Sequence, residues 1–266
     1  MASQVADYEI TGPALDERVL PCVPVHRPAR LGGGAATVWV LGPLARAPWE
    51  LTKARLEAVA AVRSEYLPSW LEAGPGEWAD RPVIWVSAAT EVAGTLASPP
   101  PGMQVPDKLR ALAAAARAAH DLHEHGQLHG AICPQAVVVR PGGASALLGP
   151  PSLADGKQPA AHVGYPPLGY ADPQLLRGEG GRWSDIWSLG ATLHQLLMGS
   201  PPFPGIDEQP VVQGLARLLT APSPGPGGMP EQAASLAGSC LSPDPADRPA
   251  TAKDVAEQLE GAAERW

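Results

Sequence analysis

The sequence predicts a two-lobed α+β protein, because its first third and its remainder follow different patterns. Short apolar runs bounded by turn residues, interrupted by one helical stretch, dominate the first third, and helical periodicity dominates the rest. The run Pro99-Pro100-Pro101-Gly102 separates the two parts. We therefore expect an N-terminal extension over residues 1–18, a β-rich lobe over 19–97 and a mainly helical lobe over 98–266.

The β-rich lobe should contain strands on both sides of one helix. A glycine turn at Gly32–Gly34 leads into a strand over 37–41, and strong helix formers run from 48 to 63. Residues 74–82 are rich in Gly and Pro, so we expect a loop there, followed by a short apolar strand over 83–86. The glycine turn favours a plain hairpin over a phosphate-binding loop, since an isolated glycine cluster is a weak signal.

The helical lobe should begin with a helix that starts at Asp107 and ends before Gly126. A hairpin is expected next, with strands over 137–139 and 146–148. Three further helices are predicted near the end of the chain, over 211–219, 230–241 and 251–264.

The stretch from Ser184 to Gly199 is the clearest helix of this lobe. Ser184 is a residue type that caps helix N-termini, and Gly199 is suited to a helix end. Large apolar residues between them are not confined to one stripe, which predicts a helix that is buried nearly all round.

Composition limits the classes of partner. The chain carries 19 Lys and Arg against 27 Asp and Glu, a net charge of -8, with no basic run. This balance argues against binding to nucleic acid or to anionic membranes. The many Ala, Arg, Pro and Gly residues with few Lys are typical of a high-GC bacterial genome.

The cysteines and the N-terminus indicate a cellular compartment. Cys22, Cys133 and Cys240 are odd in number and lack metal-type spacing, which favours a reducing environment over a disulfide framework. The first residues lack the pattern of a signal peptide, and no apolar run is long enough to cross a bilayer. We expect a cytoplasmic protein without membrane insertion.

A series of ordered segments then carries a family resemblance. The run His129-Gly130-Ala131-Ile132-Cys133-Pro134-Gln135-Ala136 stands where the family has H-R-D-L-x-x-x-N, and Gly149-Pro150-Pro151 takes the place of D-F-G. The other matching segments are Leu122–His129, Tyr170–Gln174, Ser184–Gly199 and Pro243–Pro249. In this order they resemble the protein kinase family, from about Leu31 to the C-terminus. The resemblance implies a bilobal protein-kinase-like fold, similar to a bacterial serine/threonine kinase.

The departures from the family's pattern bear on catalysis. Phosphoryl transfer in this family needs a catalytic Asp, and an Asn and a second Asp that hold magnesium. Those three places read Ala131, Ala136 and Gly149 here, and the neighbouring Arg and Lys read Gly130 and Cys133. None of these side chains is a proton acceptor or a ligand for a hard cation. The resemblance therefore implies a pseudokinase that is not an enzyme and holds no metal.

The first lobe agrees with this interpretation. Gly32 and Gly34 keep two glycines of the family's nucleotide loop, but Lys53 lies in a helical stretch and not in a strand of the V-A-I-K type. The helix Glu that normally pairs with the nucleotide lysine falls near Arg55 or Glu57. Weak, metal-independent ATP binding through the two glycines stays open as an alternative.

Other family positions are structural. Asp185 resembles the Asp that accepts hydrogen bonds from the catalytic-loop backbone. We interpret His129 as a structural residue as well. Arg248 resembles the Arg that pairs with the Glu of A-P-E, whose place is taken by Gln174, so a neutral hydrogen bond is expected there. The loop 152–169 has one Ser and no Thr, which argues against switching by phosphorylation.

Some side chains invite other assignments. The spacing of the histidines does not place them on one helical face, so we interpret them as structural or exposed and not as metal ligands: they are His120, His123, His125 and His129. No cationic group flanks Cys133 in sequence, which argues against a reactive thiol. The nearby acids that a relocated catalytic site could use are Asp155, which falls six residues too late for the family's metal ligand, and Asp121 and Asp172, which suit structural roles at a helix end and in a loop.

The sequence thus predicts a regulatory or scaffolding module that binds a protein partner through its surface. Two alternatives remain: a nucleotide-binding sensor, and a divergent ATP-dependent phosphotransferase whose acidic residues have moved.

Overall fold

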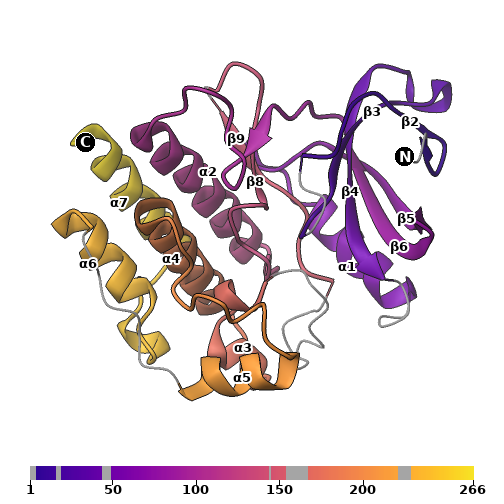
Figure 1. Ribbon diagram of the computed structural model, residues 1–266. Helices are drawn as coiled ribbons and strands as arrows, with labels where there is room; N and C mark the ends of the chain where they lie inside the picture. The colour runs from indigo at the N-terminus through magenta and orange to yellow at the C-terminus, as the bar shows by residue number, and fades with distance from the viewer. Residues whose placement is uncertain (1–3, 16–18, 44–48, 144, 154–166, 221–228) are drawn as a thin grey trace.

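The computed structural model describes residues 4–15, 19–43, 49–143, 145–153, 167–220 and 229–266. A strand-rich lobe and a helical lobe lie side by side, as Figure 1 shows. This is the mixed α+β, kinase-like arrangement expected from the sequence. No helix in the described residues is long and apolar enough to cross a membrane.

One sheet with the strand order β1-β2-β3-β4-β6-β5 forms the first lobe, and all of its pairs are antiparallel. Its strands are β1 (Gln4–Val5), β2 (Tyr8–Ile10), β3 (Cys22–His26), β4 (Ala35–Pro43), β5 (Trp70–Trp78) and β6 (Arg81–Ala88). Helix α1 (Trp49–Ala60) runs between β4 and β5 and packs against the sheet.

The sheet curls until its two edge strands meet. β1 contacts β5, and the Tyr8 hydroxyl donates to Glu72 at 2.9 Å. Arg30 adds a bridge, because its guanidinium donates to Asp7 at 2.8 Å and to Glu72 at 2.5 Å. The alternation of side chains along each strand then divides the apolar residues between two faces. Val23, Val38 and Trp85 belong to the cluster on one face, while the other face points toward α1 and the second lobe.

Residues 4–10 are not a separate extension, because β1 and β2 complete this sheet beside β3. The expected loop over 74–82 is also wrong, since β5 and β6 pair throughout it. The glycines of β5 serve a packing purpose: a Cβ on Gly74 would lie 3.1 Å from the Trp85 ring, and one on Gly76 would lie 2.9 Å from it. The indole of Trp85 requires the two glycines, which the sequence pattern presents as turn residues.

The second lobe is mainly helical. Its helices are α2 (Val105–Glu124), α3 (Pro173–Leu176), α4 (Arg182–Met198), α5 (Val211–Thr220), α6 (Glu231–Cys240) and α7 (Ala252–Glu264), and it has short 3-10 turns at Leu168–Tyr170 and Pro245–Asp247. A further 3-10 turn, Ala29–Leu31, lies between β3 and β4 in the first lobe. A small sheet of β7 (Gly94–Thr95), β8 (Val137–Val139) and β9 (Ala146–Leu148) adjoins α2. Because β7 pairs with β8, the chain joins this lobe before the proline run at 99–101.

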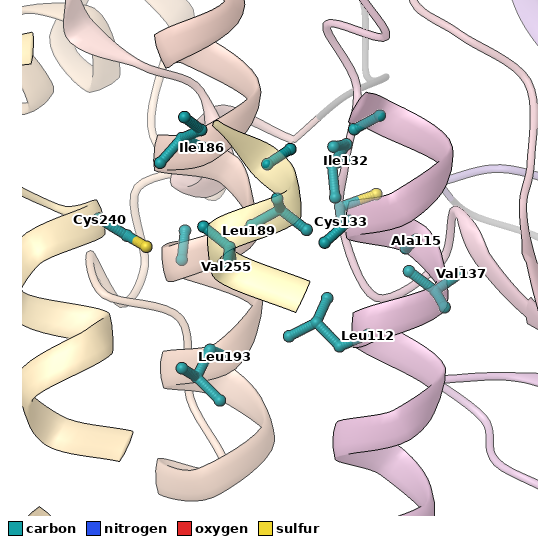
Figure 2. Close-up of a cluster of buried hydrophobic side chains, with 14 of the residues drawn as sticks. Leu112, Ala115, Ile132, Cys133, Val137, Ile186, Leu189, Leu193, Cys240 and Val255 are labelled. Atoms are coloured by element: carbon teal, nitrogen blue, oxygen red, sulfur yellow. The ribbon is translucent and has the colours of Figure 1, made fainter. Parts of the chain in front are cut away.

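Helix α4 crosses the centre of this lobe and is buried on all sides from Ser184 to His194, while its last turn is partly exposed. Figure 2 shows Ile186, Leu189 and Leu193 of α4 among apolar side chains from neighbouring elements. The helix begins at Arg182, two residues before the expected cap, with Gly181 as its N-cap. Ser184 lies inside the first turn, where its hydroxyl donates to Asp172 at 2.8 Å. Gly199 ends it with a φ of 74°, as expected.

Candidate functional site

The segment 129–136 and Gly149 lie between the two lobes and are fixed by α4. The Asp185 carboxylate accepts from the His129 amide at 2.9 Å and from the Gly130 amide at 2.7 Å. The ring Nε2 of His123, on α2, makes a third contact to it at 2.8 Å. Burial raises the pKa of Asp185, but these hydrogen bonds and the nearby histidines outweigh burial and hold the pKa below its usual value. Asp185 therefore stays ionised and shapes the loop, as the resemblance implies.

His129 ties the loop to Gly149. Its Nε2 lies 3.0 Å from the Gly149 carbonyl oxygen, and its Nδ1 lies 3.3 Å from the Ala131 amide nitrogen. Because the carbonyl only accepts and the amide only donates, the proton resides on Nε2. Complete burial lowers the pKa of His129 to about 4, so the ring is neutral near pH 7. His129 is a structural residue in this geometry.

The positions that would carry catalysis are small and enclosed. Ala131 is 1% exposed, and Ala136 and Cys133 are 0% exposed. The Gly149 amide donates to the Ala136 carbonyl at 2.7 Å, and a Cβ on Gly149 would lie 3.0 Å from that oxygen. The backbone thus closes over the place where the family has its metal-binding Asp.

The histidines around the loop make separate contacts. Among the described residues no group of three His, Cys, Asp or Glu side chains is arranged to hold a metal ion. The histidines are engaged separately, with His123 on Asp185, His125 on the Asp121 carbonyl and His129 on Gly149. Asp155 lies outside the described residues.

The nucleotide elements expected in the first lobe are dispersed. Gly32 and Gly34 have φ values of 80° and 94° in the turn that joins β3 to β4, where the Gly34 carbonyl accepts from the Arg27 amide at 2.8 Å. This turn is the plain hairpin favoured by the sequence. Lys53 lies on the exposed face of α1, 3.9 Å from Glu57. The two glycines thus lie in the β3–β4 turn and Lys53 lies on α1, on separate elements of the first lobe.

Trp39 of β4 lies beside Gly149 instead. Its side chain is fully buried, and its indole nitrogen is 3.7 Å from the point where a Cβ on Gly149 would lie. Gly34 precedes Trp39 by five residues, which is about 16 Å along a strand. The place where the family's magnesium ligand would stand thus faces an indole ring and not the glycine turn. One signal for this is visible in the sequence, a Trp inside the apolar run of β4.

Arg55 is a second residue that sequence reasoning left without a role. From α1 it donates through Nε to the Ser152 carbonyl at 2.6 Å, and through one terminal nitrogen to the Leu128 carbonyl at 2.9 Å and the His129 carbonyl at 3.3 Å. It lies near the position at which the helix Glu was expected, and its guanidinium reaches the other lobe.

The predicted pairing of Arg248 with Gln174 is wrong. Arg248 donates to both oxygens of Asp172, at 2.8 and 3.2 Å, and its guanidinium lies 5.0 Å above the Trp187 ring. Gln174 makes a 3.4 Å contact to the Pro243 carbonyl from the partly exposed first turn of α3. Asp172 precedes this helix as its cap and is fully buried, so its charge meets the arginine.

Both described ends of the loop between 153 and 167 are fixed. On one side the Ser152 amide donates to the His129 carbonyl at 2.9 Å. On the other side the Asp207 carboxylate accepts from the Leu168 amide at 2.6 Å and from the Gly169 amide at 3.3 Å. Burial raises the pKa of Asp207, while these amides act in the opposite direction. The described residues on either side of 154–166 are therefore held by hydrogen bonds to His129 and to Asp207.

Comparison with known proteins supports the kinase-like fold. The family model described as protein kinase domain matches residues 154–259. Serine/threonine-protein kinase PknK of Mycobacterium tuberculosis is 32% identical over 153 residues, which cover 56% of this chain and 14% of that protein. Mitogen-activated protein kinase kinase kinase 11 of Homo sapiens is 42% identical over 78 residues, 29% of this chain and 9% of that protein. The chain thus aligns with only a small part of the length of these relatives.

Proposed function

Because this chain belongs to the protein kinase superfamily, we propose that it is a pseudokinase, a regulatory or scaffolding module that binds a protein partner and transfers no phosphate. The relatives are named as kinases, so the proposal is a departure from their printed activity. One observation carries it. The three side chains that phosphoryl transfer needs are replaced by Ala131, Ala136 and Gly149, while Asp185 still holds the loop that contains two of them.

The surroundings of these positions favour this proposal over a relocated phosphotransferase. Ala131 and Ala136 are buried, so an acid elsewhere would need a path to them through packed side chains. Asp121 lies on α2, and in the described part of the chain no hydrogen bond joins its carboxylate to the loop. A structural role for the retained residues accounts for their contacts without any reaction.

Transfer of labelled phosphate is the direct test. The full chain is incubated with ATP and either magnesium or manganese, together with a general protein substrate, and the PknK kinase serves as the positive control. We expect no incorporation into the substrate or into the chain itself. Incorporation that Asp155→Ala or Asp121→Ala abolishes would overturn the proposal and support the relocated phosphotransferase.

Nucleotide titration separates the remaining alternative. A ligand that binds only the folded state raises the melting temperature, by a free energy that grows with the ratio of its concentration to Kd. We expect no shift with millimolar ATP or ADP, with or without magnesium. A shift that is independent of magnesium and is removed by changes at Gly32 and Gly34 would instead favour the nucleotide sensor.

A further inference from the structure

Arg55 connects three segments that are distant in the sequence. It belongs to α1 of the first lobe, and the carbonyls that it contacts belong to Leu128 and His129, before the loop, and to Ser152, after Gly149. All three are backbone oxygens, so no protonation or modification of a partner side chain is needed. A planar guanidinium has five N–H donors on separate nitrogens and can therefore bond carbonyls that lie in different directions. A lysine ammonium places all its donors on one nitrogen and reaches such separated acceptors less well.

The guanidinium occupies space next to Gly130. A Cβ on Gly130 would lie 3.9 Å from a terminal nitrogen of Arg55 and 3.4 Å from the Ser152 Cβ. Gly130 also has a φ of 69°, which disfavours any larger residue. The positive φ, and not the space beside the guanidinium, therefore favours glycine at this position.

Trp39 joins the lobes from the other side of the loop. It shares one buried cluster with Leu20 and Leu41 of the first lobe and with Val138 and Leu147 of the small sheet. Its ring also packs edge to face against Trp70 of β5, at 5.7 Å between centroids. This indole is thus part of the apolar contact between the lobes.

We infer that the two lobes are held together by the chain's own side chains, with Trp39 filling the space between them and Arg55 fastening α1 to the loop. The contact between the two lobes then forms without bound nucleotide and without phosphorylation of the loop. Any partner surface that spans both lobes is present in the free protein. This inference rests on the proposed function only in that no nucleotide is needed, and it concerns conformation, not reaction.

Hydrogen exchange of the full chain tests the role of Arg55. Arg55→Ala should speed exchange of the amides of α1 and of Ser152 by about ten-fold or more, because both segments lose a tie to the opposite lobe. Lys53→Ala is the matched control, since it removes a cation from the exposed face of α1, and it should leave these rates unchanged. Arg55→Lys should resemble Arg55→Ala, as one ammonium does not replace the planar fork.

Chemical rescue tests Trp39 separately and still applies if the Arg55 variants do not fold. Trp39→Ala should melt at a lower temperature, and added indole should raise its melting temperature but not that of the wild type, because an apolar cavity binds a ligand of matching shape. Trp39→Phe keeps an aromatic ring in place and should need no indole.

Three results would overturn the inference: unchanged exchange in folded Arg55→Ala, no effect of indole on Trp39→Ala, or slower exchange of α1 in the wild type when ATP is added. Phosphate transfer by the wild type would count against the proposed function alone, because the exchange experiment measures closure without any reaction.

Discussion

Arg248 and Asp172 form a two-pronged ion pair in which both side chains are almost completely buried, with exposed fractions of 1% and 0%. Asp172 also accepts from the Ser184 hydroxyl, and Arg248 donates to the Ser242 and Trp183 carbonyls. The pair therefore links the cap of α3, the first turn of α4 and the turn before α7.

Removing one member of this pair should be strongly destabilising. Arg248→Ala leaves the Asp172 carboxylate buried without its cation, and such a loss costs roughly 3–5 kcal/mol of unfolding free energy. The control is Arg117→Ala, which removes a partly exposed ion pair with Glu260 and should lower the unfolding free energy by less than about 1 kcal/mol. Urea unfolding measures both values, and equal losses would contradict the assignment. Gln174→Ala should have little effect, because Arg248 does not pair with it.

Gly190 and Gly238 should respond in opposite directions to alanine. A Cβ on Gly190 would lie 2.4 Å from the Cys240 Cβ, so Gly190→Ala forces α4 and α6 apart and should cost about 1–3 kcal/mol. Gly238 lies on the exposed face of α6 with open space around it. Gly238→Ala should therefore raise the unfolding free energy by roughly 0.5–1 kcal/mol through helix propensity. Thermal melts of the two variants check the sign of each change, and a stabilised Gly190→Ala would contradict this packing.

The pKa of His129 predicts a loss of stability in mild acid. Its pKa is about 4 in the folded chain against 6.5 for the unperturbed group, so the unfolded state binds the extra proton between these values. Stability from this residue is fully present above pH 6.5 and declines as the pH falls toward 4, by roughly 3 kcal/mol in total. Burial lowers the pKa of His194 as well, which adds a contribution of the same sign.

Unfolding free energies measured from pH 7 to pH 4 test this expectation. His129→Gln removes the titrating group and should flatten the profile relative to the wild type, although it lowers stability at pH 7. A variant with the full wild-type slope would show that other groups cause it.

Restoring the family's polar residues should not restore nucleotide binding. The triple change Ala131→Asp, Ala136→Asn and Gly149→Asp supplies the missing side chains, but the new aspartate at 149 meets the Ala136 carbonyl and faces the Trp39 indole. We expect no magnesium-dependent rise in melting temperature with ATP and a lower stability without it. The single change Ala131→Asp separates the effect of the loop from that at 149. A magnesium-dependent rise in the triple variant would contradict the enclosed geometry.

The helices were largely predictable, because caps and periodicity are local. Gly199 ends α4, as the sequence indicates, and α7 (Ala252–Glu264) lies where the last helix was predicted, with Thr251 as its cap. The β5 strand was not predictable, since Gly74 and Gly76 are required by an indole on the next strand and not by a turn. Local patterns carry no information about a partner that lies across the sheet.

The candidate site divides along the same line. The role of Asp185 could be predicted from the order of the motifs, because the loop and α4 keep the family's spacing. The same order identified Ala131, Ala136 and Gly149 as the residues at the family's catalytic positions. The contacts of Arg55 and Trp39 required the fold, since each crosses between lobes to backbone or apolar groups that have no sequence signature. Arg248 was assigned to the wrong acceptor because Asp172 and Gln174 are only two residues apart, and burial decides between them.

The bridge from Arg30 to Asp7 and Glu72 bears on the behaviour of the protein in concentrated solution. An open sheet edge offers unpaired amides and carbonyls to which a second chain can add a strand. Here the outermost strand, β1, is two residues long, and the ion pairs hold it beside β5 at the opposite edge. The curled sheet thereby protects itself against edge-to-edge aggregation, and high salt, which screens exposed ion pairs, weakens that protection.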